Sequence, residues 1–136
     1  MRRLFVDTFY LIALAHPRDQ WRPRVLAFSR ALRDYHLYTV DEVLAEFLTA
    51  CSSSGICIRQ RAGQTVRTAL QDRQWTVFPQ SRSSLLDALT LYEARPDKEY
   101  SLTDCIAMQT MRREGLTEVL TNDHHFTQEG FSILFP

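Results

Sequence analysis

Cysteine and glycine are scarce in this sequence of 136 residues, which contains three cysteines and four glycines. The cysteines Cys51, Cys57 and Cys105 are odd in number and lack CxxC spacing, so we predict free thiols rather than disulfides. Among these thiols and the four histidines, only His124 and His125 are closely spaced, which argues against a zinc site. The glycines form neither a P-loop nor a GxGxxG motif, which argues against a nucleotide-binding switch.

The sequence also lacks a long hydrophobic run. Its apolar stretch from Leu4 to Ala15 is short and is interrupted by Asp7. Such a stretch is too short for a membrane span and unlike a signal peptide, so we expect a cytoplasmic protein with no membrane partner. The chain length is near that of the commonest domains, and we expect a single domain over residues 1–136.

Neither sign of charge predominates. The sequence has 16 basic and 16 acidic residues and a formal net charge of zero, so any nucleic-acid binding must come from local patches. Lysine is nearly absent, since Lys98 is the only one, and arginine is the better bidentate ligand of phosphate. Genomic base composition also explains this bias, so residue usage alone identifies no partner.

Short apolar stretches alternate with segments of helical periodicity along the chain. The stretches that we expect to form strands are residues 4–6, 36–38, 75–78, 119–120 and 133–135. The expected helices are residues 8–14, 19–34, 40–51, 58–72, 83–94 and 101–113. Alternating strands and helices favour right-handed crossovers. The sequence therefore predicts an α/β fold with a short, mostly parallel central sheet that is flanked by helices on both faces.

Two aspartates lie just beyond the ends of predicted strands. Asp7 follows residues 4–6, and Asp123 follows residues 119–120. In parallel α/β sheets the functional crevice lies beyond the carboxyl ends of the strands, so both side chains are candidates for one shared site. Each aspartate alone also suits a helix cap or a turn. Thr8 is a second residue able to cap, however, which leaves the carboxylate of Asp7 without a structural role.

The segment after residues 36–38 contains two glutamates. Thr39 and Glu42 have the spacing of a capping box, in which Thr39 caps the helix and Glu42 reaches back. Glu46 lies one turn later, at the border of the apolar face, and the box gives it no role. A carboxylate there needs a cation, a donor or water. Glu46 is therefore a candidate ligand, with an ordinary surface glutamate as the alternative.

Asp104 lies at the start of the helix predicted from Ser101. The spacing of Ser101 and Asp104 matches a capping box, which is one interpretation of this acid. The apolar run Cys-Ile-Ala-Met after Asp104 predicts that the first turn is partly buried, where a carboxylate without a partner is costly. Asp104 is therefore a further candidate ligand.

Carboxylates that converge on one site favour the binding of a cation. Like charges repel, and the groups take up protons at neutral pH unless a cation neutralises them. Carboxylate oxygens are hard ligands that favour Mg²⁺ or Mn²⁺. One or two such ions can activate a water molecule and stabilise the leaving oxygen in phosphodiester cleavage, without a histidine or cysteine nucleophile.

Four segments of the sequence resemble, in order, the four motifs of PIN domains. They are residues 4–8 (LFVDT), 39–46 (TVDEVLAE), 101–107 (SLTDCIA) and 120–126 (LTNDHHF). Their order and spacing resemble those of the compact VapC-like toxins, whose length is similar to that of this chain. The resemblance implies a three-layer αβα PIN-like fold and a metal-dependent endoribonuclease that cleaves RNA as the toxin of a toxin–antitoxin pair.

The resemblance also assigns roles to individual residues. It implies four catalytic acids that bind Mg²⁺ or Mn²⁺, namely Asp7, Glu46, Asp104 and Asp123. Thr8 and Thr121 lie where small hydroxyl residues support such a site. Asn122 departs from the residues common at its position, so whether it orients a ligand stays open.

The partners that the resemblance implies are an RNA substrate, a cognate antitoxin whose C-terminal segment lies across the active groove, and a second copy of the chain in a homodimer. The polar helix expected over residues 58–72 adds Arg59, Arg61 and Arg67 as candidate RNA-binding residues. The alternative for these arginines is a solvated helix face.

Other functions remain as alternatives. A PIN-like module could bind RNA or protein without cutting, or an RNA-processing nuclease could act outside a toxin–antitoxin system. A phosphohydrolase of the haloacid dehalogenase type also begins with a strand that ends in aspartate. That chemistry requires a second aspartate two residues later, where this sequence has Phe9.

Overall fold

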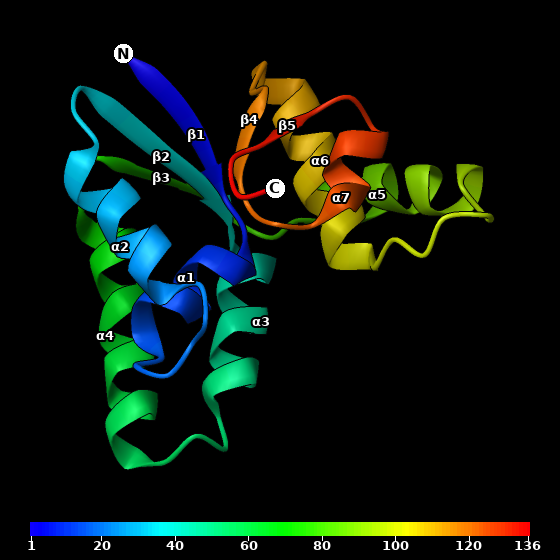
Figure 1. Cartoon of the computed structure of the whole chain (residues 1–136). Helices are drawn as coiled ribbons and strands as arrows, with labels where there is room; N and C mark the ends of the chain where they lie inside the picture. Colours follow the sequence, from blue (N-terminus) through cyan, green and yellow to red (C-terminus); the bar gives the residue numbers. More distant parts are fainter.

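The computed structural model describes residues 1–136 as an α/β fold of five strands and seven helices (Figure 1). The strands are β1 (Arg2–Val6), β2 (Tyr35–Val40), β3 (Trp75–Phe78), β4 (Glu118–Leu120) and β5 (Ser132–Ile133). The helices are α1 (Thr8–Ala15), α2 (Arg22–Ala31), α3 (Asp41–Cys51), α4 (Ile56–Gln71), α5 (Arg82–Ala94), α6 (Leu102–Glu114) and α7 (His124–Gln128). No helix combines the length and the apolar character needed to cross a bilayer.

The five strands form one sheet in the order β3-β2-β1-β4-β5. Every neighbouring pair is parallel, so the expectation of a mostly parallel sheet is confirmed and the sheet is parallel throughout. The chain extends the sheet from β1 to one side through β2 and β3, and then to the other side through β4 and β5. This reversal makes the carboxyl ends of β1 and β4 the point where a ligand crevice is expected.

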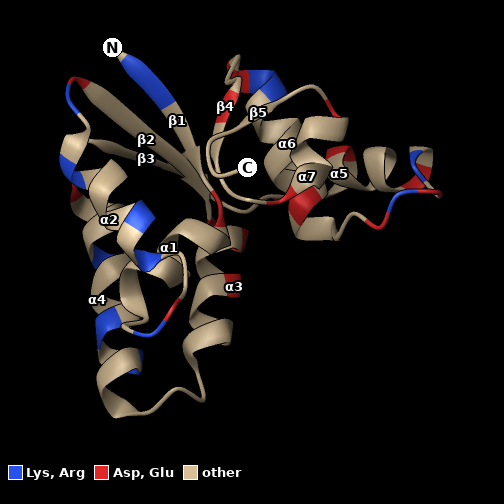
Figure 2. Ribbon diagram, viewed as in Figure 1, with Lys and Arg blue, Asp and Glu red and all other residues tan.

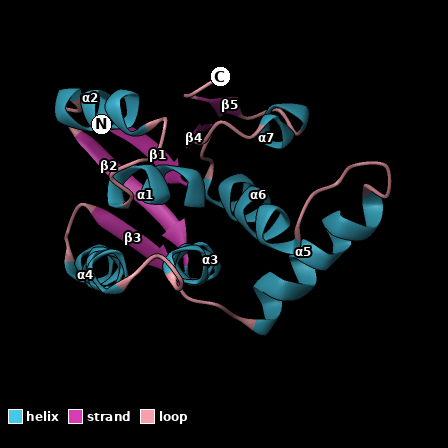
Figure 3. Ribbon diagram, turned by 60° about the horizontal axis from the view of Figure 1, so that its bottom comes forward, coloured by secondary structure: helices cyan, strands magenta, loops and turns pink.

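The core surrounds the central strand β1. Leu4, Phe5 and Val6 have no solvent-exposed surface, as expected for a parallel strand that is covered on both faces. The helices that flank the sheet form two groups, α1 to α4 and α5 to α7 (Figure 1). Figure 3 shows α3 and α4 nearly end-on beside β3, with α5 and α6 beyond α3.

The predicted capping box of Thr39 and Glu42 is wrong. Thr39 is still part of β2, and its hydroxyl donates to the carbonyl oxygen of Val6 at 2.8 Å across the sheet. Val40 occupies the N-cap of α3 without a side-chain hydrogen bond. The carboxylate of Glu42 therefore has no capping role, because the strand continues one residue further than the capping pattern suggested.

The predicted capping box at Ser101 and Asp104 is confirmed. Asp104 donates its backbone N–H to Ser101 Oγ at 3.0 Å, and Asp104 Oδ2 accepts the backbone N–H of Ser101 at 3.1 Å. Helix α6 ends at Gly115, which has a left-handed φ of 68° that favours glycine. The start and the end of this helix follow directly from its sequence.

Helix α2 is shorter than the expected 19–34. Asp19 Oδ1 accepts the backbone N–H of Trp21 at 2.8 Å in a turn before the helix, and Asp34 adopts a left-handed φ of 49° after it. The polar residues at both ends therefore stabilise turns instead of helix. The strand expected over residues 133–135 is also displaced, since β5 covers Ser132–Ile133.

Candidate functional site

The edge of the sheet where the strands end holds Asp7 and Thr121. Asp7 follows β1 and Thr121 follows β4, and the pairing of Val6 with Leu120 places the two residues side by side. The Thr121 hydroxyl donates to Asp7 Oδ2 at 2.8 Å in the protein interior. The same hydroxyl oxygen accepts the backbone N–H of Asp123 at 3.2 Å. One threonine thus connects the first and the last of the predicted acids.

Glu46 reaches this edge through Thr8. Helices α1 and α3 pack against each other, and Thr8 Oγ1 at the start of α1 donates to Glu46 Oε1 on α3 at 2.7 Å. The prediction that Thr8 caps α1 is wrong, because Asp7 occupies the N-cap and neither residue makes a capping hydrogen bond with its side chain. Both side chains instead point into the site.

Asp104, Asp123 and His125 form the other half of the site. Asp123 is the N-cap of α7, and its Oδ1 accepts the backbone N–H of His125 at 2.9 Å. His125 Nδ1 lies 3.4 Å from Asp123 Oδ1 and 3.7 Å from Asp104 Oδ2. One potential ligand atom from each of the three residues lies within 4.8 Å of the others. This spacing suits a shared cation.

Burial, and to a smaller extent the charges of neighbouring acids, raise the pKa values of Asp7 and Asp104. Burial raises the pKa of Asp7 to about 7, hydrogen bonds from two threonines oppose the shift, and the charges of Asp104 and Glu46 add to it. Burial also raises the pKa of Asp104, and the charge of Asp123 adds to that shift. These effects connect all four acids, which we call the acid cluster. No lysine or arginine forms an ion pair with any of them.

The side chains of Asp104, Asp123 and His125 suit a divalent cation. Carboxylate oxygens are the usual ligands of Mg²⁺ and Mn²⁺, and an imidazole nitrogen suits a transition metal such as Mn²⁺ better than Mg²⁺. His125 Nδ1 is buried and has no hydrogen-bond partner in the chain. Buried polar atoms are normally paired, and a cation shared with Asp104 and Asp123 would pair this one.

His125 lies in this site although its sequence context indicated no role there, because in the sequence it stands out only as one of two adjacent histidines. Helix α7 spans five residues, which is too short for its periodicity to be recognised. The signal that could have found it is Asp123 two positions earlier, since an aspartate at an N-cap orients the first helical turn. Asn122, between Thr121 and Asp123, forms no side-chain hydrogen bond.

The arginines of α4 lie apart from the acid cluster. Helix α4 packs on α1, α3 and β3, and α3 separates it from α6 and α7 (Figures 1 and 3). Figure 2 shows basic residues along α4 and acidic residues where β1, α3, α6 and α7 meet. Arg59 donates to the carbonyl oxygen of Ser52, and Arg61 donates to that of Ala15, so both hold neighbouring loops. RNA binding by Arg59, Arg61 and Arg67 stays a prediction.

Comparison with proteins of known structure shows the same fold. VapC20 of Mycobacterium tuberculosis, described as a sarcin-ricin loop cleaving toxin, superimposes with a TM-score of 0.83 and 21% identity over 94% of this chain and 95% of its own. FitAcB from Neisseria gonorrhoeae gives a TM-score of 0.66 and 16% identity over 96% of this chain and 95% of its own. VapBC2 from Rickettsia felis gives 0.66 and 11% identity over 96% of both chains.

No curated protein matches this sequence. The sequence pattern of the PIN domain, in contrast, matches residues 4–131 and so includes all four acids of the cluster. The match covers nearly the whole chain, and the structural neighbours are VapC and FitB toxins. The chain therefore belongs to the PIN-domain family.

Proposed function

We propose that this PIN domain is a Mg²⁺- or Mn²⁺-dependent endoribonuclease whose catalytic acids are Asp7, Glu46, Asp104 and Asp123. The observation that carries the proposal is the acid cluster itself. Its members lie at one edge of the sheet, burial and neighbouring acids raise the pKa values of Asp7 and Asp104, and no member has a basic side chain as a partner. An anionic cluster of this kind needs a bound cation to stay ionised at neutral pH.

A bound divalent cation supplies a Lewis acid that activates water and stabilises the leaving oxygen. The chain itself orients the ligands. Thr8 fixes one oxygen of Glu46, and Thr121 fixes Oδ2 of Asp7 while it accepts the backbone N–H of Asp123. These hydroxyls hold the carboxylates of Glu46 and Asp7 in defined directions before a cation binds, which reduces the reorganisation that binding requires. A supporting role for Asn122 stays a prediction.

The test is cleavage of a mixed-sequence oligoribonucleotide pool in Mn²⁺, with and without chelator, by the wild-type protein and by Asp7→Asn. The matched control is Glu93→Gln, because Glu93 is an exposed acid on α5 with no ion pair. We expect cleavage by the wild type and the control, none by Asp7→Asn, and complete loss in chelator that added Mn²⁺ reverses. Cleavage that persists in chelator would show that the acid cluster is not a metal-dependent site.

We further propose that the biological role is that of a toxin with a cognate antitoxin, and that two copies form a homodimer. The support is that several structural neighbours are VapBC or FitAB complexes. Helix α5 also exposes Leu86, Leu89 and Tyr92 at helical spacing, with exposed fractions of 54%, 40% and 51%. Exposed apolar stripes are typical of interfaces between protein chains.

The dimer and the antitoxin are tested separately. Sedimentation equilibrium should give a dimer for the wild type and a monomer for Leu86→Glu combined with Tyr92→Glu. Growth arrest on expression, relieved by the product of an adjacent gene, would establish the toxin role. Cleavage in vitro without growth arrest would favour an RNA-processing nuclease, and metal binding without cleavage would favour a non-catalytic module.

A further inference from the structure

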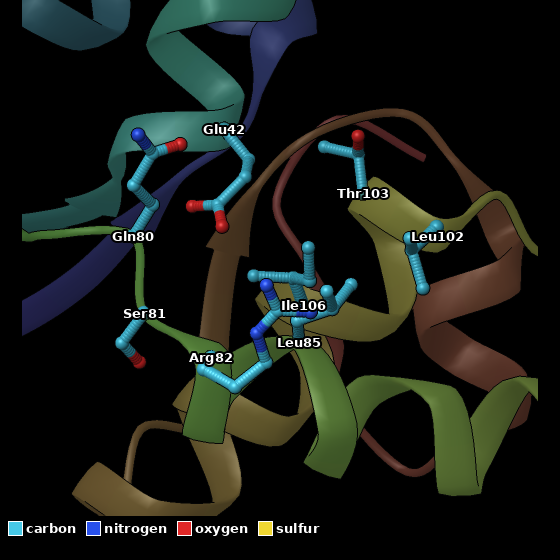
Figure 4. Close-up of a pocket in the computed structure, with 8 residues that line it drawn as sticks. All are labelled: Glu42, Gln80, Ser81, Arg82, Leu85, Leu102, Thr103 and Ile106. Carbon is cyan, nitrogen blue, oxygen red and sulfur yellow. The ribbon is translucent and has the colours of Figure 1, made fainter.

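A cavity of about 570 Å³ lies beside the acid cluster (Figure 4). Its walls come from the start of α3, the loop between β3 and α5, the first turns of α5, and the start of α6. Glu42 on the cavity wall lies one helical turn before Glu46, and Thr103 directly precedes Asp104. The cavity is therefore next to two of the four acids, Glu46 and Asp104.

The cavity has an apolar floor. Leu85, Leu102 and Ile106 line it from α5 and α6, and Figure 4 shows these side chains gathered on one side of the space. Aliphatic side chains of this kind contact the flat face of a planar group. A nucleobase is planar, and RNA is recognised by sequence chiefly where a base leaves its stack and enters such a pocket. The volume lies within the usual range for a small-molecule site.

The rim of the cavity carries one anionic and one cationic side chain. Glu42 is only an acceptor of hydrogen bonds and Arg82 is only a donor. The two form no ion pair with each other or with any other residue. Figure 4 shows the Glu42 carboxylate and the Arg82 guanidinium both directed toward the cavity. Since Glu42 does not cap α3, its carboxylate is free to bind a ligand.

The loop that presents Arg82 is fixed on both sides. The backbone N–H of Gln80 donates to Asp41 Oδ2 at 2.9 Å, which attaches the loop to the start of α3. Ser81 Oγ accepts the backbone N–H of Ser84 at 3.0 Å and caps α5. These contacts fix the backbone on either side of Arg82 relative to the start of α3 before any ligand arrives, which favours selective binding.

A carboxylate beside an RNA strand repels its phosphates, so Glu42 contributes to binding only through donors on a base. Guanine presents two adjacent donors, N1–H and the N2 amino group, which match the two oxygens of a carboxylate. Its O6 is an acceptor that suits a guanidinium. Uracil has a single donor on this edge, and adenine and cytosine present one amino group beside an acceptor that a carboxylate repels.

We propose that this cavity binds a guanine base of the RNA next to the cleaved phosphate, with Glu42 accepting from N1–H and N2–H and Arg82 donating to O6. Cleavage next to the bound base rests on the proposed nuclease function, whereas binding of the base does not. Glu42 and Arg82 are specificity residues in this assignment, and neither holds the cation.

Binding is tested first, by following backbone amide resonances while GMP, IMP, AMP, CMP or UMP is added with Mg²⁺. We expect GMP to shift the resonances of Ser81, Leu102 and Thr103. IMP lacks the N2 amino group and should bind about tenfold more weakly, as should GMP with Glu42→Gln, because each loses part of a bidentate pair. Glu93→Gln should match the wild type. Equal binding of all five nucleotides, or no shift at these residues, would overturn the proposal.

Cleavage is tested second, by sequencing the RNA ends that the wild type and Glu42→Gln produce from the mixed-sequence pool. We expect guanine to be enriched beside the cut for the wild type and not for Glu42→Gln. Cutting without base preference would overturn the guanine assignment and leave the nuclease intact. Selective binding of GMP by a protein that cuts no RNA would contradict the nuclease and leave the cavity assignment intact.

Discussion

Two regions of this protein place carboxylates in its interior. In one region basic side chains pair with the carboxylate, and in the other region none does. Glu129 has a side chain that is 4% exposed and binds Arg95, Arg112 and Tyr100 at 2.9, 2.6 and 2.9 Å. Burial alone would raise its pKa, but these three donors lower the pKa to about 2. Asp7 is 8% exposed, has no cationic partner, and has a pKa of about 7.

The difference distinguishes Glu129, a carboxylate that stabilises the fold, from Asp7, whose charge no basic side chain neutralises. A buried charge that only stabilises the fold is found with its counter-charges. The acid cluster lacks such counter-charges, because no lysine or arginine forms an ion pair with its members. The two regions are also in contact, because Tyr100 donates to Glu129 while its ring packs edge-on against His125, with the ring centroids 5.1 Å apart.

The largest effect should come from Asp7→Asn. We expect this change to lower the rate of RNA cleavage by about 100-fold or more, the usual loss when a group that stabilises charge in the reaction is removed. The same change should raise the free energy of unfolding in metal-free buffer at pH 7 by about 1 kcal/mol or more, because it removes a buried charge that the fold does not neutralise. Single-turnover kinetics and urea unfolding measure the two effects. A lower free energy of unfolding for Asp7→Asn would contradict the inference that the charge of Asp7 destabilises the metal-free fold.

Glu129→Gln should have the opposite effect on stability. The loss should be about 2 kcal/mol, because the change removes the buried charge that binds two arginines, whose own side chains are about 40% exposed and stay solvated. Glu118→Gln is the matched control, since Glu118 forms a partly exposed ion pair with Arg2 and should contribute about 1 kcal/mol or less. Urea unfolding at pH 7 measures both. Equal losses of unfolding free energy would mean that the buried ion pairs of Glu129 stabilise the fold no more than the partly exposed pair of Glu118.

The two regions should also give opposite responses to pH. The lowered pKa of Glu129 adds stability that is present above about pH 4.5 and is lost as the pH falls toward 2. The raised pKa of Asp7 means that the folded metal-free protein keeps a proton that the unfolded chain releases, so stability is lost as the pH rises from about 4 to 7. Unfolding free energies over this range should show both slopes. Asp7→Asn should remove only the loss of stability between about pH 4 and 7, and Glu129→Gln should remove only the loss below about pH 4.5.

His125→Asn should change the choice of cation. If His125 Nδ1 is a ligand, the affinity for Mn²⁺ should fall by about tenfold while the affinity for Mg²⁺ changes less, because imidazole contributes mainly to transition-metal binding. Calorimetric titration of each ion measures this, with His124→Asn as the control, since His124 is exposed and forms no ion pair. An equal loss for both ions would indicate an indirect role.

The smallest effect should come from α4. If this helix faces RNA, reversing the charges of Arg59, Arg61 and Arg67 should weaken RNA binding and reduce its dependence on salt. An unchanged salt dependence of the dissociation constant would assign the helix to a solvated face. Melting temperatures should accompany the binding data, because Arg59 and Arg61 also hold backbone carbonyl groups.

The sequence predicted the elements whose signals are local. The capping box at Ser101 and the buried strand before Asp7 both appear in the structure, because each depends on residues within one or two turns of one another. The capping box at Thr39 failed for the opposite reason. Its hydroxyl found a partner on β1, which is distant in sequence, and tertiary pairing overrode the local pattern.

The four acids were identified from the sequence because the segments around them resemble the four PIN-domain motifs in order, whereas each acid alone also suited a cap, a turn or the protein surface. Their convergence was decided only by the tertiary structure. The parallel register of β1 and β4 sets Asp7 beside Thr121, and the packing of α1 on α3 brings Thr8 to Glu46. The role of His125 and the cavity beside Glu42 could not be predicted from the sequence. Both depend on elements that meet only in the folded protein and leave no periodic signal along the chain.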